Sequence, residues 1–205
     1  MGDRQSDYKE ACRILDRRFN RGGRRISKED AGTLRNTWDD ARMGNNLLLA
    51  LENTIGYAGA DEVDEIVFTP GFLTSRELWH THRMKNAMVT VHRGCEHDEI
   101  MTMDNDFYGY SWTLDREVAE FFSWRKDEKN GHVLMAQVPG YLLAWLDTPE
   151  SEIIAIGVEP NMAVTTRKHQ YGGGAMAWSK KRAITSGQAT KMGLVQRTRR
   201  GKPPD

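Results

Sequence analysis

Three short stretches of the 205-residue sequence place polar side chains where chemistry could occur. Arg93 stands at the end of the apolar run "AMVTVHRG", where a guanidinium needs an anionic partner. Ser111 and Thr113 lie two residues apart in "YGYSWTL", so an extended chain directs both hydroxyls to one face. Glu150 and Glu152 are also two apart, before the run "IIAIGV", and we expect both carboxylates on the same side of an extended chain.

Each of these stretches also has a structural interpretation without any ligand. Arg93 could form a salt bridge, for example with one of the two glutamates, and the glutamates could lie on a solvated loop. The two hydroxyls could hydrogen-bond to each other or to the backbone of a half-buried strand. Gly94, directly after Arg93, allows the close approach of either another backbone or a ligand.

The elements that position these residues change in type near residue 87. Before it, apolar residues recur at helical spacing, and helices are expected over 8–19, 27–41, 45–55 and 75–84. After it, short β-branched and apolar runs predict strands over 87–94, 109–114, 132–140, 141–147, 152–158 and 162–166. A helix over 115–122, with Val118, Phe121 and Phe122 inward, follows the Ser111 stretch. Close strand spacing predicts a mostly antiparallel or mixed sheet, hence an α+β protein.

The composition fits one soluble domain over residues 1–205. Apolar residues make up 39% of the chain and charged residues 28%, and the formal net charge is zero. We divide the domain into a mainly helical part (1–86), a β-rich core (87–166) and a basic, glycine-containing C-terminal extension (167–205). No apolar run has the length of a membrane span, and the charged N-terminus is unlike a signal peptide, which predicts a cytoplasmic protein without a membrane partner.

Metal binding and disulfides are not expected from the sequence. Cys12 and Cys95 belong to no C-x-x-C pattern, and His80 and His82 would diverge on a helix. The C-terminal extension carries ten Lys and Arg against the single acid Asp205. It could be a solvated terminus or could contact the phosphates of a nucleic acid.

Taken together, the three stretches resemble the Arg-Ser-Glu class of mono-ADP-ribosyltransferases, which includes bacterial toxins, vertebrate ectoenzymes and phage enzymes. The resemblance rests on Arg-Gly closing a strand ("VHRG"), Ser-x-Thr followed by an Ala-Phe-Phe helix ("SWTLDREVAEFFS"), and Glu-x-Glu opening a strand ("ESEIIAI"), in that order. It covers about residues 88–166. It implies a split β core of two small sheets, packed around an NAD cleft and preceded by the N-terminal helices.

The resemblance also implies a role for each residue type. Glu152 would stabilise the positive charge that develops on the ribose when the nicotinamide bond of NAD breaks. Arg93 would bind the diphosphate, and the Gly94 backbone would contact the nicotinamide amide. Ser111 would hydrogen-bond to Glu152 and position it, and Thr113 would support the same network.

Glu150 bears on the acceptor of the ADP-ribose. In family members with Glu-x-Glu, the first glutamate helps to activate the acceptor, in many cases an arginine guanidinium. The resemblance therefore favours transfer to a macromolecule, a protein side chain before a nucleic acid, with NAD as the substrate. If the chain is phage-encoded, the reaction would take place in the host cytoplasm. No oligomeric state is predicted.

Two departures from the family pattern concern single residues. His92 replaces the usual aromatic residue before the arginine, and since it faces away from Arg93 we interpret it as a packing replacement. A sister class pairs a His with a Tyr on the second strand, but Ser111 occupies that place, which excludes that assignment. Trp112 replaces a small residue at a position that faces the core.

Two alternative functions remain open at the level of sequence. The same residues could hydrolyse NAD without an acceptor, which would make the protein an NAD glycohydrolase. A protein with this fold could instead be a non-catalytic module that binds nucleic acid through its basic C-terminus, in a strongly salt-dependent manner.

Overall fold

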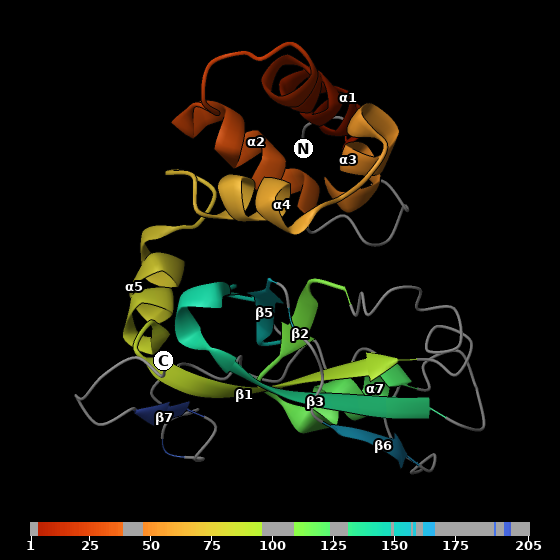
Figure 1. The fold of residues 1–205 in the computed structure, drawn as a ribbon, viewed down its shortest axis with the longest axis vertical. Helices are drawn as coiled ribbons and strands as arrows, with labels where there is room; N and C mark the ends of the chain where they lie inside the picture. The colour runs from red at the N-terminus through yellow and green to blue at the C-terminus, as the bar shows by residue number, and fades with distance from the viewer. Residues whose placement is uncertain are drawn as a thin grey trace. The chain divides into compact units, whose positions relative to one another are not determined.

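The computed structural model describes residues 4–38, 47–95, 109–123, 131–148, 150–156, 158, 162–166, 191 and 195–197. By the packing of its backbone, the chain divides into two compact units, Met1–Ser75 and Arg76–Asp205 (Figure 1). We call them the helical unit and the sheet unit. The boundary between the units lies before Ala87, where the sequence predicts the change from helices to strands, because helix α5 packs with the strands.

The helical unit contains four α-helices among its described residues: α1 (Arg4–Leu15), α2 (Lys28–Trp38), α3 (Leu47–Ile55) and α4 (Ala60–Val67). Helix α1 continues into a π-helical turn, η1 (Asp16–Asn20). Ser27 caps the N-terminus of α2, since the Asp30 amide donates to Ser27 Oγ at 3.1 Å. Helix α4 was not predicted, although its buried residues Val63, Ile66 and Val67 recur at helical spacing.

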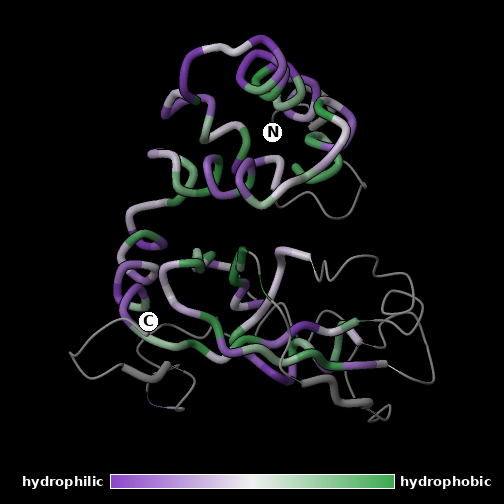
Figure 2. The backbone as a smooth tube through the Cα atoms, in the orientation of Figure 1, coloured by the Kyte–Doolittle hydropathy of each residue, from purple (hydrophilic) through white to green (hydrophobic). Residues whose placement is uncertain are grey.

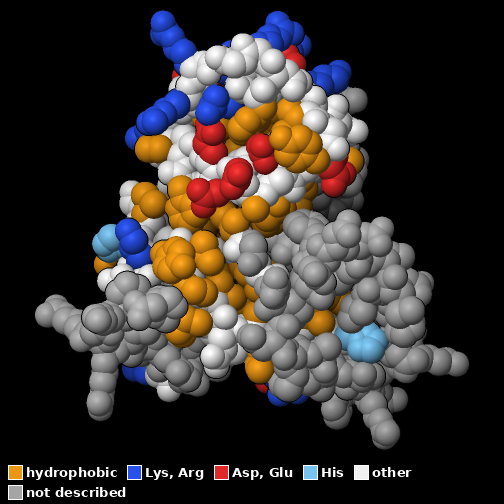
Figure 3. Space-filling model, viewed as in Figure 1, with side chains coloured by type: hydrophobic (Ala, Val, Ile, Leu, Met, Phe, Trp, Pro, Cys, Tyr) orange, Lys and Arg blue, Asp and Glu red, His pale blue; other side chains and the backbone are white. Residues whose placement is uncertain are grey.

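Polar and apolar residues alternate along these helices, as the hydropathy colours of Figure 2 show. The apolar ones form the core of the unit, which includes Ile14, Leu34, Leu51 and Ile66, all almost fully buried. The surface is rich in charge, and Figure 3 shows Lys and Arg side chains projecting from this unit with acidic side chains between them. One pair bridges two elements: Arg18 of η1 donates two hydrogen bonds to Glu65 of α4, at 2.5 and 2.8 Å.

The sheet unit begins with α5 (Ser75–Met84) and continues with strands and one further α-helix. Its other elements are β1 (Ala87–Cys95), β2 (Ser111–Thr113), α7 (Arg116–Ser123), β3 (Gly131–Pro139), the 3-10 turn η2 (Gly140–Leu142), β4 (Leu143–Trp145), β5 (Glu152–Ala155), β6 (Met162–Thr166) and β7 (Val195–Arg197). All six predicted strands and both predicted helices of this region are present. The α+β class is confirmed.

All strand pairs among the described residues are antiparallel, in the order β4-β5-β2-β1-β3-β6, with β7 also paired to β1. Strand β1 pairs with β3 along almost its whole length. Its other edge is shared: β7 pairs with Ala87–Val89, and β2 joins only through His92 and Thr113. The described strands thus form one hydrogen-bonded sheet and not the two separate sheets that we expected, although a single residue pair joins the halves.

One apolar core connects the two halves of this sheet. It combines Val89, Val91 and Ala136 from the β1 and β3 half with Trp112, Trp145 and Ile153 from the β2, β4 and β5 half. Residues from both halves of the sheet therefore belong to one hydrophobic cluster. This packing holds β2 and β5 in place despite their single link to β1.

Helix α5 is tied to the end of β4. The His80 ring lies 4.3 Å from the Trp145 ring, and the Thr81 hydroxyl accepts a hydrogen bond from the Trp145 amide at 3.0 Å. The buried Glu77 carboxylate accepts another from the Asp147 amide at 2.9 Å. These contacts explain why α5 belongs to the sheet unit.

Strand β7 was not predicted. It lies in the basic C-terminal extension, so part of that segment is paired with the sheet; most of the extension lies outside the described residues. Within the described parts of the chain, no helix is long and apolar enough to cross a membrane.

Candidate active site

Ser111 and Glu152 meet at the junction of β2 and β5. The register pairs Thr113 with Glu152 and Ser111 with Ile154, so the side chains of Ser111, Thr113 and Glu152 project from one face. Ser111 Oγ donates a hydrogen bond to Glu152 Oε1 at 2.7 Å. The contact that we expected from the resemblance is present, and as a hydrogen bond to a carboxylate it belongs to the stronger kind.

Arg93 reaches the same residue from β1. Its Nη1 donates to the backbone oxygen of Ser111 at 2.7 Å. The guanidinium also lies against Gly109, since a Cβ atom built there would be 2.9 Å from Arg93 Cζ. Ser111 therefore binds Glu152 through its hydroxyl and Arg93 through its carbonyl, which brings the three residues of the Arg-Ser-Glu pattern together.

Thr113 lies at the buried end of β2. Its hydroxyl donates to the backbone oxygen of Glu150 at 2.6 Å and accepts from the Asp115 amide at 3.0 Å. The residue is only 6% exposed. Thr113 thus fastens the loop before β5 to the start of α7, a role that favours support of the site over direct contact with NAD.

The loop from Thr148 to Glu152 differs from our expectation in its backbone. Ser151, between the two glutamates, is buried and has a φ of 52°, in the left-handed region. The chain is therefore not extended at Ser151, so the spacing of two residues does not place both carboxylates on the same side. Glu150 is exposed, whereas Glu152 is half-buried and its amide donates to Thr148 Oγ1 at 3.2 Å.

The structure explains why residue 94 is a glycine, and this explanation was not evident from the sequence. A Cβ atom at this position would collide with the backbone oxygen of Ala119 in α7. Gly131 of β3 is under the same constraint, from the backbone of Ser123. The missing side chain of Gly94 makes room for a helix, so the absence of a Cβ is no argument for contact with nicotinamide.

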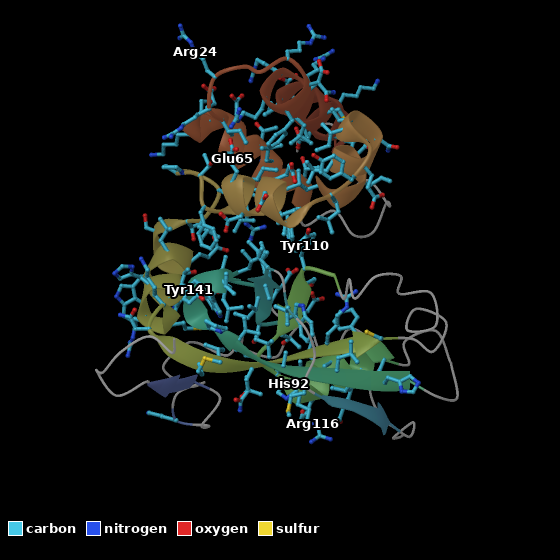
Figure 4. All side chains as sticks on the ribbon, in the orientation of Figure 1. Arg24, Glu65, His92, Tyr110, Arg116 and Tyr141 are labelled. Carbon is cyan, nitrogen blue, oxygen red and sulfur yellow. The ribbon has the colours of Figure 1, made fainter. Side chains whose placement is uncertain are left out.

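His92 faces away from Arg93, as predicted, and is buried with only 6% of its surface exposed. Burial lowers the pKa of His92, and the charge of Arg116 lowers this pKa further, against the weaker opposing effects of Asp115 and Glu120. Figure 4 labels His92 and Arg116, both on the sheet unit. A buried, neutral ring agrees with a packing role.

Gly109 and Trp112 have contacts at the site, and the sequence alone assigned neither of them a role in it. Gly109 has a φ of 72° and touches Arg93, and its backbone oxygen accepts a hydrogen bond from Trp112 Nε1 at 3.0 Å. A glycine before an aromatic residue is a weak signal, and it becomes informative only once Arg93 is placed against it.

No group of three or more His, Cys, Asp or Glu side chains with the arrangement of a metal site occurs in the described parts of the chain. Comparisons of the sequence with protein-family models, with curated proteins and with solved structures found no significant match. The interpretation of the site therefore depends on its residues and their geometry.

Proposed function

We propose that the protein is a mono-ADP-ribosyltransferase, which transfers ADP-ribose from NAD to a macromolecular acceptor and releases nicotinamide. The observation that carries this proposal is the pair of hydrogen bonds at Ser111, one to Glu152 Oε1 and one from Arg93 Nη1, both at 2.7 Å. Cleavage of NAD requires a cation for its diphosphate and an oriented carboxylate for its ribose, and Ser111 is hydrogen-bonded to one candidate for each role.

Arg93 would hold the diphosphate of NAD. A guanidinium has five N–H donors in a plane, so it can bind a phosphate oxygen while it keeps its hydrogen bond to Ser111. That hydrogen bond and the contact with Gly109 fix the plane before the substrate arrives. The binding energy would then place the ribose relative to Glu152.

Glu152 would act on the ribose. In the reaction, the bond between the nicotinamide nitrogen and ribose C1′ breaks, and its electron pair leaves with nicotinamide, which becomes neutral. The positive charge that remains is shared by C1′ and the ring oxygen, as in glycoside cleavage. A carboxylate held by the Ser111 hydroxyl needs little reorganisation to stabilise this charge.

Glu150 would serve the acceptor. The nucleophile forms its new bond at C1′ and loses a proton, which the exposed carboxylate of Glu150 would accept. The hydrogen bond from Thr113 to the Glu150 backbone oxygen would keep this side of the loop in place. A protein side chain, with arginine among the candidates, is the acceptor that we favour.

The test uses NAD labelled in its adenylate part, incubated with the purified protein and a cell extract. Wild-type protein should release nicotinamide and transfer label to protein, while Glu152→Gln should lose both signals by at least about 100-fold, the usual scale for loss of a group that stabilises transition-state charge. Glu52→Gln is the matched control, because Glu52 is an exposed residue of α3 in the helical unit. Its activity should equal that of the wild type.

The outcomes separate the alternatives. Nicotinamide release without label on any macromolecule would identify an NAD glycohydrolase and contradict transfer. Label that nuclease removes and protease does not would replace the protein acceptor by a nucleic acid. If folded wild-type protein neither releases nicotinamide nor transfers label, that result would contradict an enzymatic function.

A further inference from the structure

We infer that Gly109 and Trp112 are positioning residues for Arg93, and that they fix the guanidinium relative to Glu152. The inference rests on the proposed function, because it assigns to this pair the placement of the NAD diphosphate. It concerns two residues outside the Arg-Ser-Glu pattern, one of which replaces a small residue of the family.

The first observation concerns the fit between Gly109 and the guanidinium. A Cβ atom on Gly109 would lie 2.9 Å from Cζ, 3.0 Å from Nη2 and 3.1 Å from Nη1 of Arg93. The flat guanidinium therefore lies against the Cα of Gly109. The backbone of Gly109 is in the left-handed region, with φ at 72°, which also disfavours any other residue. The backbone conformation favours glycine, and a side chain at this position would displace the Arg93 guanidinium.

The second observation concerns what holds Gly109. Its carbonyl oxygen accepts a hydrogen bond from Trp112 Nε1 at 3.0 Å. Trp112 is 2% exposed and belongs to the apolar core of the sheet unit, together with Ile153, its partner in the register of β5. A side chain so enclosed cannot follow a mobile loop, so the indole anchors the Gly109 peptide to the core.

The third observation is that both contacts converge on one short stretch. From Gly109 to Trp112, the chain contacts Arg93 at Gly109 Cα and at the Ser111 carbonyl, and it contacts Glu152 at the Ser111 hydroxyl. Trp112 fixes the first of these points from inside the core. A change in Trp112 would therefore alter the position of Arg93 while the Ser111–Glu152 hydrogen bond persists.

The experiment measures nicotinamide release as a function of NAD concentration for wild type, Trp112→Phe and Gly109→Ala. Phe keeps an aromatic ring in the core, removes the Nε1–H donor and leaves the volume of the missing ring atoms unfilled. We expect Trp112→Phe to raise KM about 3- to 10-fold, the effect of one neutral hydrogen bond, with kcat within about twofold of the wild type. Gly109→Ala should raise KM further. The Ki of ADP-ribose, measured as a competitor, should rise in parallel.

A matched control and a double variant distinguish positioning from general damage. Trp79→Phe removes an indole from an exposed site on α5 and should leave KM unchanged. In an Arg93→Lys background, Trp112→Phe should have little further effect on KM, because the planar group that it positions is gone. A purely structural role of Trp112 would give the same added effect in both backgrounds.

Each outcome decides the inference. Wild-type turnover with an unchanged KM in Trp112→Phe would overturn the inference and leave the proposed function intact. A fall in kcat alone, from less folded protein, would overturn it as well. Absence of nicotinamide release from wild-type protein would overturn both. If Gly109→Ala does not fold, Trp112→Phe and the double variant still decide the question.

Discussion

Ser111 contributes to the site through two different atoms, and these can be separated experimentally. Ser111→Ala removes the hydroxyl that binds Glu152 and leaves the carbonyl that binds Arg93. We expect kcat for nicotinamide release to fall about tenfold, since a hydrogen bond to a charged group contributes roughly 1.5–3 kcal/mol and solvent can partly replace it here. KM for NAD should stay within about twofold of the wild type. Steady-state kinetics checks both values, and a rise in KM with constant kcat would contradict the division of roles.

His92 makes the stability of the protein depend on pH. Its pKa is lowered in the folded state, so the unfolded state binds the proton more readily and stability rises with pH. The stabilisation is fully present above the unfolded pKa of about 6.5 and is lost as the pH falls from there towards the folded value. The free energy of unfolding should fall by up to about 1.4 kcal/mol per pH unit in that window.

His92→Phe is the variant that tests this pH dependence. Urea unfolding at pH 5, 6, 7 and 8 should show a smaller loss of stability for His92→Phe than for wild type below pH 6.5. His80, whose pKa is also lowered by burial, would still contribute in both proteins. Parallel curves for the two proteins would show that His92 does not titrate differently on folding.

At the scale of elements, α7 is held against the sheet by close contact with Gly94 of β1 and Gly131 of β3. Gly94→Ala should force the helix away and destabilise the sheet unit by about 1–3 kcal/mol or more, as overpacking does. Thermal unfolding measures this change. Gly32→Ala in α2 is the control, because a Cβ there meets no atom within 4 Å and alanine favours a helix by about 0.5–1 kcal/mol. Equal stability of Gly94→Ala and wild type would contradict the close packing.

Most elements of the sheet unit could be predicted because each has a local signal. The run 87–94 is apolar and β-branched, and the period changes at Asp115, where α7 follows. Strand β7 has no such signal: "VQR" is three residues long and is a strand only because β1 offers it an edge. These residues form a strand because they pair with β1, and a local sequence pattern carries no information about that pairing.

The site could be predicted only in part for a similar reason. The resemblance supplied Ser111 and Glu152 as partners, and their hydrogen bond is present. The left-handed backbone of Ser151 and the contact of Gly94 with α7 arise from packing between distant segments, so neither could be derived from spacing. The roles of Arg93, Glu150 and Glu152 in catalysis stay predictions.

At the scale of the whole molecule, Val195–Arg197 of the C-terminal extension pair with β1 and belong to the sheet. Removing residues 191–205 deletes β7 and exposes the edge of β1 at Ala87–Val89. We expect the truncated chain to unfold at a lower temperature and to lose nicotinamide release together with transfer. Calorimetry and the labelled-NAD assay measure these effects. Retention of NAD cleavage with loss of transfer would instead assign the segment to target recruitment.

The pairing of β7 with β1 also orders events during synthesis. Because β1 begins at Ala87 and β7 ends at Arg197, this edge of the central strand stays open until Arg197 has been translated. An unpaired edge is a site of unwanted association. A nascent chain that has not yet reached β7, or one that is terminated before it, should therefore be prone to aggregate, so the complete sheet unit can form only after β7 has been translated.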